Sequence, residues 1–194
     1  MDDAIFTTLS STGIRVGELV VLKWKNIDFD KRTIYVTKTY FNPKNNTVKF
    51  QLVPPKTKNS RRKGVVSEVV IDVLKKHKEE QEKIIKHLGG SYCNNDYVFA
   101  NVNRHPGYPI LIKFVENRMA RILKMTELNR ALTPHSLRHT HTSLLAEAGV
   151  PLEAIKERLG HEDDEITKRI YLHITNVMKT EAADQFSKHM GGLI

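Results

Sequence analysis

Apolar positions along the chain recur with two different spacings, which predict several helices and a small sheet. Between residues 67 and 88 they recur every three or four positions, as on one side of a helix, and Gly89 and Gly90 end the pattern. The same spacing predicts further helices over residues 3–11, 15–22, 110–125, 133–148, 151–159, 164–172 and 175–190.

A different spacing predicts strands in one part of the chain. Residues 33–40 are rich in β-branched and aromatic side chains, and apolar and polar residues alternate over residues 48–52. A turn at residues 42–46 separates these two strands, and Val65 lies in a third. We therefore expect an α+β, mainly helical fold with a small antiparallel three-stranded sheet.

The helix expected after Thr133 combines an apolar side with basic residues. Thr133 is a common N-cap residue, and Pro134 suits the first helical position. His135 and Arg138 are three residues apart, so they share a face of the first turn, where unpaired backbone N–H groups favour a phosphate. A different side of this helix, which we expect to face the core, carries Leu137, Leu144, Leu145 and Ala148.

Charge and composition narrow the class of partner. The chain has 31 Lys and Arg residues against 22 Asp and Glu residues, a net charge of +9, which favours an anionic partner and nucleic acid first. Cys93 is the only cysteine in the sequence, so an intrachain disulfide is impossible and a cytoplasmic location fits. We find neither a signal peptide nor an apolar run that could span a membrane.

Two groups of charged residues have both a structural and a functional interpretation. Arg15 and Glu18 are three residues apart, and an ordinary helical ion pair is a simpler explanation than a carboxylate that braces a phosphate-binding arginine. The loop at residues 56–63 contains five cations and no acid, so a phosphate contact is as reasonable as a solvated loop. The basic residues of this loop are Lys56, Lys58, Arg61, Arg62 and Lys63.

Several motifs follow one another in a characteristic order. Thr12-Gly-Ile-Arg-Val-Gly-Glu18 comes first, a hairpin lysine follows, and then come His135-x-x-Arg138, Leu159-Gly-His161 and Tyr171. This order resembles the catalytic domain of the tyrosine recombinases, the family of phage and transposon integrases. The segment from Leu137 to Leu145 looks particularly like integrases of phages and conjugative transposons from Gram-positive bacteria.

The resemblance implies a role for each matching residue. Tyr171 would attack a DNA phosphorus, which gives a 3′-phosphotyrosyl bond and a free 5′-hydroxyl. Arg15 and Arg138 would hold the non-bridging oxygens, because guanidinium groups stay ionised and present forked donors. His161 would hydrogen-bond a non-bridging oxygen, and His135 would take up or return the proton of the phenol.

The resemblance also implies roles for the basic loop at residues 56–63. A lysine there would protonate the leaving 5′-oxygen, and Lys56 is the first choice while Lys58 competes with it. No metal or cofactor is expected, because the arginines supply the positive charge. The residues expected to bind the DNA backbone are Lys58, Arg61, Arg62 and Lys63.

The extent of the resemblance bears on assembly. Residues 1–194 match a single catalytic domain, so we expect the C-terminal part of a longer integrase whose arm-binding and core-binding domains are absent here. The implied partner is double-stranded attachment-site DNA, on which the full-length protein would form a homotetramer. The isolated domain is expected to be a monomer or weak dimer, with residues 175–194 as a tail helix that docks in cis or passes to a neighbouring protomer.

Other functions fit the sequence less well. A non-catalytic DNA-binding module explains the charge but gives no reason for Tyr171 or the arginines. A type IB topoisomerase uses similar chemistry, but the chain is short and its 137–145 segment is integrase-like. His135 and His139 are spaced to share a zinc ion, yet His141 points away from them on a helix and there is no HExxH pattern.

Overall fold

The expected α+β, mainly helical fold is confirmed by the computed structural model, which describes residues 1–54, 61–160 and 165–191. The helices are α1 (Asp2–Thr12), α2 (Val16–Leu19), α3 (Glu68–Leu88), α4 (Ile112–Lys124), α5 (Pro134–Glu147), α6 (Leu152–Leu159) and α7 (Glu165–Gly191), with 3-10 turns η1 (Trp24–Asn26) and η3 (Gly89–Ser91). The strands are β1 (Ile27–Asp28), β2 (Thr33–Val36), β3 (Thr39–Phe41), β4 (Gln51–Val53) and β5 (Arg62–Val65).

The antiparallel sheet has three strands, but their membership differs from the prediction. The order is β1-β2-β5, and β2 pairs with β5 from Thr33 opposite Val65 to Val36 opposite Arg62. The run at residues 33–40, expected as one strand, divides into β2 and β3, and β3 pairs with β4 in a separate two-stranded hairpin. Strand propensity does not reveal this division, because both halves suit a strand and only their pairing partners differ.

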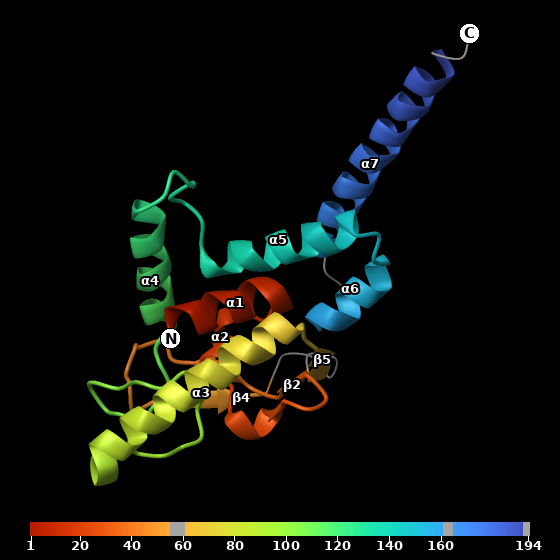
Figure 1. Cartoon of the computed structure of the whole chain (residues 1–194). Helices are drawn as coiled ribbons and strands as arrows, with labels where there is room; N and C mark the ends of the chain where they lie inside the picture. Colours follow the sequence, from red (N-terminus) through yellow and green to blue (C-terminus); the bar gives the residue numbers. More distant parts are fainter. Residues whose placement is uncertain (55–60, 161–164, 192–194) are drawn as a thin grey trace.

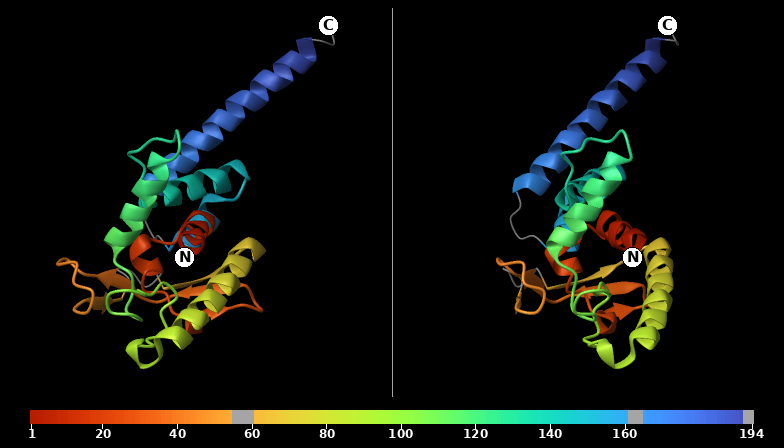
Figure 2. Two further views of the ribbon diagram at one scale, coloured as in Figure 1. Left: turned by 60° about the vertical axis from the view of Figure 1, so that its left-hand side comes forward. Right: turned by 90° about the vertical axis from the view of Figure 1, so that its left-hand side faces the viewer.

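Two of the predicted helices have different limits in the structure. The one expected over residues 15–22 is only the four residues of α2, after which Lys23 makes a β-bridge with Tyr97. The two expected over residues 164–172 and 175–190 are one helix, α7, because hydrogen bonding continues through that region. Figures 1 and 2 show α7 projecting away from the rest of the molecule. No described helix is long and apolar enough to cross a membrane.

The helix α1 lies between α3 and α5 and connects two differently built regions (Figure 1). On the side of α3 and the sheet, a large apolar core contains side chains such as Ile5, Leu74 and Phe99, all fully buried. On the other side, a much smaller cluster consists of Ala146, Ile155 and Leu159. Arg138 meets the end of α1 beside this smaller cluster, and Tyr171 packs against the cluster.

Candidate active site

The first arginine of the motifs stands at a sharp change of chain direction. Gly13 ends α1 in the left-handed region, with φ of 63°, and a Cβ atom there would come within 2.8 Å of the His141 ring. Arg15 then precedes α2, and its backbone N–H donates to Oε2 of Glu18 at 3.1 Å. The guanidinium Nη1 of Arg15 donates to Oε1 at 2.9 Å, and 33% of the side chain stays exposed. Glu18 therefore holds Arg15 at both its backbone N–H and its guanidinium, while a third of the side chain stays exposed.

Glu18 is not the ordinary surface partner that the sequence suggested. Its side chain is 1% exposed, and it binds Arg62 as well as Arg15. Nη1 and Nη2 of Arg62 donate to Oε1 and Oε2 of the carboxylate at 3.2 and 2.9 Å. Burial raises the pKa of Glu18, but the hydrogen bonds and charge of Arg62, together with the charge of Arg15, outweigh it and lower the pKa below its usual value. A buried carboxylate thus holds two arginines.

Arg138 is buried on α5 and bridges two distant backbone segments. Its side chain donates through Nη1 to the carbonyl of Gly13 and through Nη2 to that of Leu159, the latter at 2.8 Å. Only 3% of the residue is exposed. The chain therefore brings Arg138 to the turn that carries Arg15, although more than a hundred residues separate the two in sequence.

This burial contradicts the expected orientation of α5. Leu144 is 56% exposed, Ala148 is exposed, and Leu137 and Leu145 are only half-buried. The helix instead turns a polar face inward, because those side chains have hydrogen-bond partners in the interior. Its buried residues are Pro134, Arg138, His141, Thr142 and Ala146.

The three histidines of α5 have different surroundings. The rings of His135 and His139 meet edge to face, with centroids 4.7 Å apart, near the exposed start of the helix. His141 is buried, and its Nε2 accepts a hydrogen bond from Nε of Arg158 at 3.1 Å. Burial, the charge of Arg158 and the charge of Arg138 lower the pKa of His141 to about 4, against a hydrogen bond to the Ser10 backbone that favours the cation. His141 is thus neutral near pH 7.

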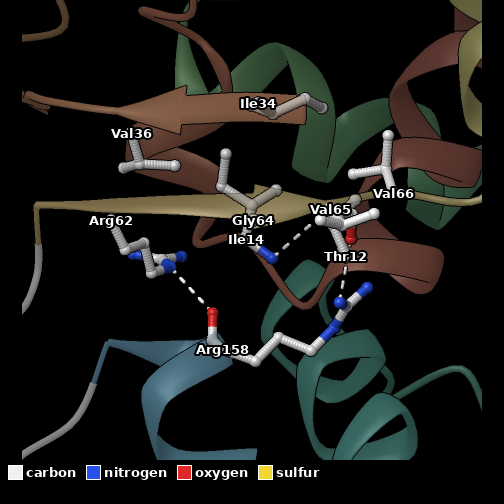
Figure 3. Close-up of a pocket in the computed structure, with 9 residues that line it drawn as sticks. All are labelled: Thr12, Ile14, Ile34, Val36, Arg62, Gly64, Val65, Val66 and Arg158. Carbon is white, nitrogen blue, oxygen red and sulfur yellow. Dashed lines mark hydrogen bonds between the residues drawn. The ribbon is translucent and has the colours of Figure 1, made fainter. Parts of the chain in front are cut away.

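Arg158 is a site residue that the sequence reasoning missed. Besides its bond to His141, it donates from Nη1 to the carbonyl of Val65 at 2.9 Å and from Nη2 to that of Ser11 at 3.3 Å. Figure 3 shows it below a small cavity of about 20 Å³ between β5 and the end of α1. In the sequence it is one charge among several on α6, so nothing distinguished it.

Tyr171 stands on α7, where its half-buried ring packs against the apolar cluster of Ala146, Ile155 and Leu159. The carbonyl of Leu159 is the one that Arg138 holds, so the end of α6 links the tyrosine to the arginines.

Arg61 and Lys63 are exposed at β5, as a DNA-binding role requires, whereas the side chain of Arg62 is 9% exposed. The predicted residues Lys56, Lys58 and His161 lie outside the described residues.

The chain belongs to the phage integrase family, whose family model matches residues 1–177. It is 33% identical over 177 residues to an integrase of Staphylococcus phage L54a, an alignment that covers 91% of this chain and 49% of the relative. It is 35% identical over 195 residues to a tyrosine recombinase XerC-like protein of Caldanaerobacter subterraneus, with 93% and 48% covered. The chain spans about half the length of these curated relatives.

Solved structures agree with this family. The Tn1549 transposon integrase in complex with transposon right end DNA matches with a TM-score of 0.68 and 27% identity, over 93% of this chain and 58% of that one. The XerA recombinase matches in fold with a TM-score of 0.69 and 24% identity, over 94% of this chain and 57% of that one. The resemblance in sequence and the expected tyrosine-recombinase fold are thereby confirmed.

Proposed function

We propose that this chain is the catalytic domain of a site-specific DNA recombinase, which integrates or excises a mobile element by breaking and rejoining DNA strands. The observation that carries the proposal is the meeting of Arg15 and Arg138 at one turn, where Arg138 holds the carbonyl of Gly13. The buried charge of Arg138 thus lies beside the turn that presents Arg15, and positive charge at this turn suits the oxygens of a phosphate. The family, the DNA-bound integrase of similar fold and the net charge of +9 support the same activity.

The proposed reaction begins with the attack of Tyr171 on the scissile phosphorus. The bond from the tyrosine oxygen to phosphorus forms as the bond from phosphorus to the 5′-oxygen breaks, so a phosphodiester linkage is conserved for rejoining. The phenol of Tyr171 gives its proton to His135. The lysine of the basic loop, Lys56 in first place, returns a proton to the leaving 5′-oxygen.

The arginines act as fixed charges in this scheme. Arg15, whose side chain is 33% exposed, binds the phosphate, and the buried guanidinium of Arg138, which bonds two carbonyls, adds positive charge beside it. His161 completes the set of donors to the non-bridging oxygens. Each preorganised donor of this kind contributes on the order of 10²- to 10³-fold to the rate.

The proposal extends to partners and location. Double-stranded attachment-site DNA in the bacterial cytoplasm is the substrate, and Arg61 and Lys63 contact its backbone beside the site. The longer integrase forms a tetramer on that DNA. The part of α7 beyond residue 175, whose described side chains are exposed, is the tail that docks on the same or a neighbouring protomer.

Covalent trapping tests this function. A nicked suicide duplex is built from the junction sequence of the element that encodes the chain, and an SDS-resistant protein–DNA adduct is measured. We expect an adduct with the unaltered chain, none with Tyr171→Phe, and about 10²- to 10³-fold slower formation with Arg138→Ala. Tyr108→Phe is the matched control and should form the adduct normally. An undiminished adduct with Tyr171→Phe, or no adduct with the unaltered chain, would contradict the proposal.

A further inference from the structure

We propose that Arg62 is a positioning residue of the active site, which holds Glu18 against Arg15 and ties the end of α6 to both, and that it does not bind DNA. This inference rests on the recombinase function proposed above. It replaces the phosphate contact expected for Arg62 from the basic loop. A contact with the DNA backbone is still expected for its neighbours Arg61 and Lys63, because both are exposed.

The first argument is how Arg62 binds Glu18. Its two terminal nitrogens each meet a different carboxylate oxygen, at 3.2 and 2.9 Å, which is the forked geometry in which an arginine binds a carboxylate most strongly. Only 9% of the Arg62 side chain and 1% of the Glu18 side chain are exposed. A buried carboxylate left with one partner is costly, so this pair fixes the position of Glu18.

The second argument is the remaining nitrogen of the same guanidinium. Nε of Arg62 donates to the carbonyl of Arg158 at 2.9 Å, a bond that Figure 3 shows between β5 and the end of α6. The next carbonyl along α6, that of Leu159, accepts from Arg138 at 2.8 Å. Two arginines from different elements therefore bind two consecutive carbonyls at the end of α6.

The third argument concerns what Arg62 leaves available on Arg15. Arg62 takes up both oxygens of Glu18, and the guanidinium of Arg15 contacts the carboxylate through Nη1 alone. Among the described residues, no other partner of the Arg15 guanidinium is found, and 33% of its side chain is exposed. Arg15 can thus present its remaining N–H groups to a phosphate, while Arg62 keeps Glu18 from drawing that head inward.

The bonds join the parts of the site into one ring. It runs from Arg15 through Glu18 and Arg62 to the end of α6, and from there through Arg138 back to the turn at Gly13. Tyr171 packs against the apolar cluster to which Leu159 belongs. Loss of Arg62 opens this ring, so we expect the arginines and the tyrosine to lose their alignment without loss of a DNA contact.

The test separates binding from chemistry. For the unaltered chain, Arg62→Gln and Arg62→Lys, the dissociation constant for a duplex of arbitrary sequence is measured over a range of salt, and the rate of covalent adduct formation is measured at saturating suicide duplex. We expect Arg62→Gln to slow the adduct about 10- to 100-fold, as a small misplacement of reacting groups does. Its dissociation constant and salt slope stay unchanged. Arg62→Lys, which keeps the charge but lacks the fork, recovers part of the rate.

Arg61→Gln is the matched control, because it removes the same charge from the exposed neighbour. It should weaken binding and lower the salt slope by about 1, which Arg62→Gln should not do. Circular dichroism establishes that each variant is folded, and Arg62→Lys carries the test if Arg62→Gln does not fold.

The outcomes distinguish a failure of the role proposed for Arg62 from a failure of the proposed recombinase function. An unaltered chain that forms no adduct overturns the recombinase function and the role of Arg62 with it. An adduct that forms equally fast with Arg62→Gln overturns the role of Arg62 alone. A salt slope lowered by about 1 in Arg62→Gln identifies a phosphate contact and also overturns it.

Discussion

The region from α1 to α4 and the region from α5 to α7 fill their interiors with different kinds of side chain. The first packs apolar residues such as Phe99, Leu74 and Ile5 around α1 and α3. The second has a small apolar cluster, and it places Arg138, His141 and Arg158 near the end of α1, each hydrogen-bonded to backbone or to another of these side chains. The first region thus gains its stability mainly from apolar burial, while buried hydrogen-bonded side chains join the second region to the turn that carries Arg15.

This difference has a physical basis. Apolar side chains gain free energy by leaving water, whatever their orientation, and so they make a tolerant core. Buried arginines must find hydrogen-bond partners at defined distances, which fixes where the backbone lies but contributes less net stability. The proposed active site, in which Arg138 binds the turn that carries Arg15, gains from the second kind of interior.

The largest effect on stability is expected in the apolar core. Phe99→Ala removes a fully buried ring and should lower the free energy of unfolding by about 3–5 kcal/mol. Urea unfolding followed by circular dichroism measures it. Phe41→Ala is the matched control, because Phe41 is 51% exposed and its loss should cost less than about 1 kcal/mol. Equal effects at the two positions would remove the distinction between core and surface on which this comparison depends.

A smaller, pH-dependent effect is expected from His141. Its pKa is lowered from 6.5 to about 4 in the folded protein, so between these values the unfolded chain binds the proton more readily. Neutral His141 contributes fully to the free energy of unfolding above about pH 6.5. This contribution, up to about 3 kcal/mol, is lost as the pH falls towards 4.

Urea unfolding of the unaltered chain and His141→Gln, at several pH values, measures this contribution. His77, whose pKa is also lowered by burial, remains in both proteins and cancels in the difference. A glutamine can still accept from Arg158 but does not titrate, so the variant should lose less stability on acidification. Parallel pH profiles would show that His141 does not titrate as its surroundings indicate.

The smallest effect on stability is expected from the tail. The described side chains from residue 176 to residue 190 are exposed, including Phe186 at 66%, so removal of residues 176–194 should change the free energy of unfolding by less than about 1 kcal/mol. Sedimentation should show a monomer or weak dimer for the intact chain, and no association after the deletion. A tight dimer that survives the deletion would argue against exchange of the tail between protomers.

A single variant refines the test of the tail. Phe186→Ser keeps the helix but removes its most exposed large aromatic side chain. If the tail docks through its apolar side chains, this variant should weaken association nearly as much as the deletion does. Unchanged association would place the contact elsewhere on the helix.

The sequence by itself determined the element types and the family. The spacing over residues 67–88 predicted α3, whose observed bounds are Glu68–Leu88, and Thr133 with Pro134 placed the start of α5 correctly. Local preferences decide such features, because helical spacing and capping depend on near neighbours alone. The order of motifs from Arg15 to Tyr171 likewise needed no structure to indicate the integrases.

Only the tertiary structure decided which side of α5 faces inward. Hydrophobicity favoured Leu144 for the interior, yet Leu144 is 56% exposed while Arg138 is 3% exposed. The carbonyls of Gly13 and Leu159 accept hydrogen bonds from Arg138. They come from distant parts of the chain, so no local sequence pattern predicts these bonds. The roles inferred for Arg62 and Arg158 depend on the same kind of contact. A buried polar side chain is stable only beside partners that the fold itself supplies.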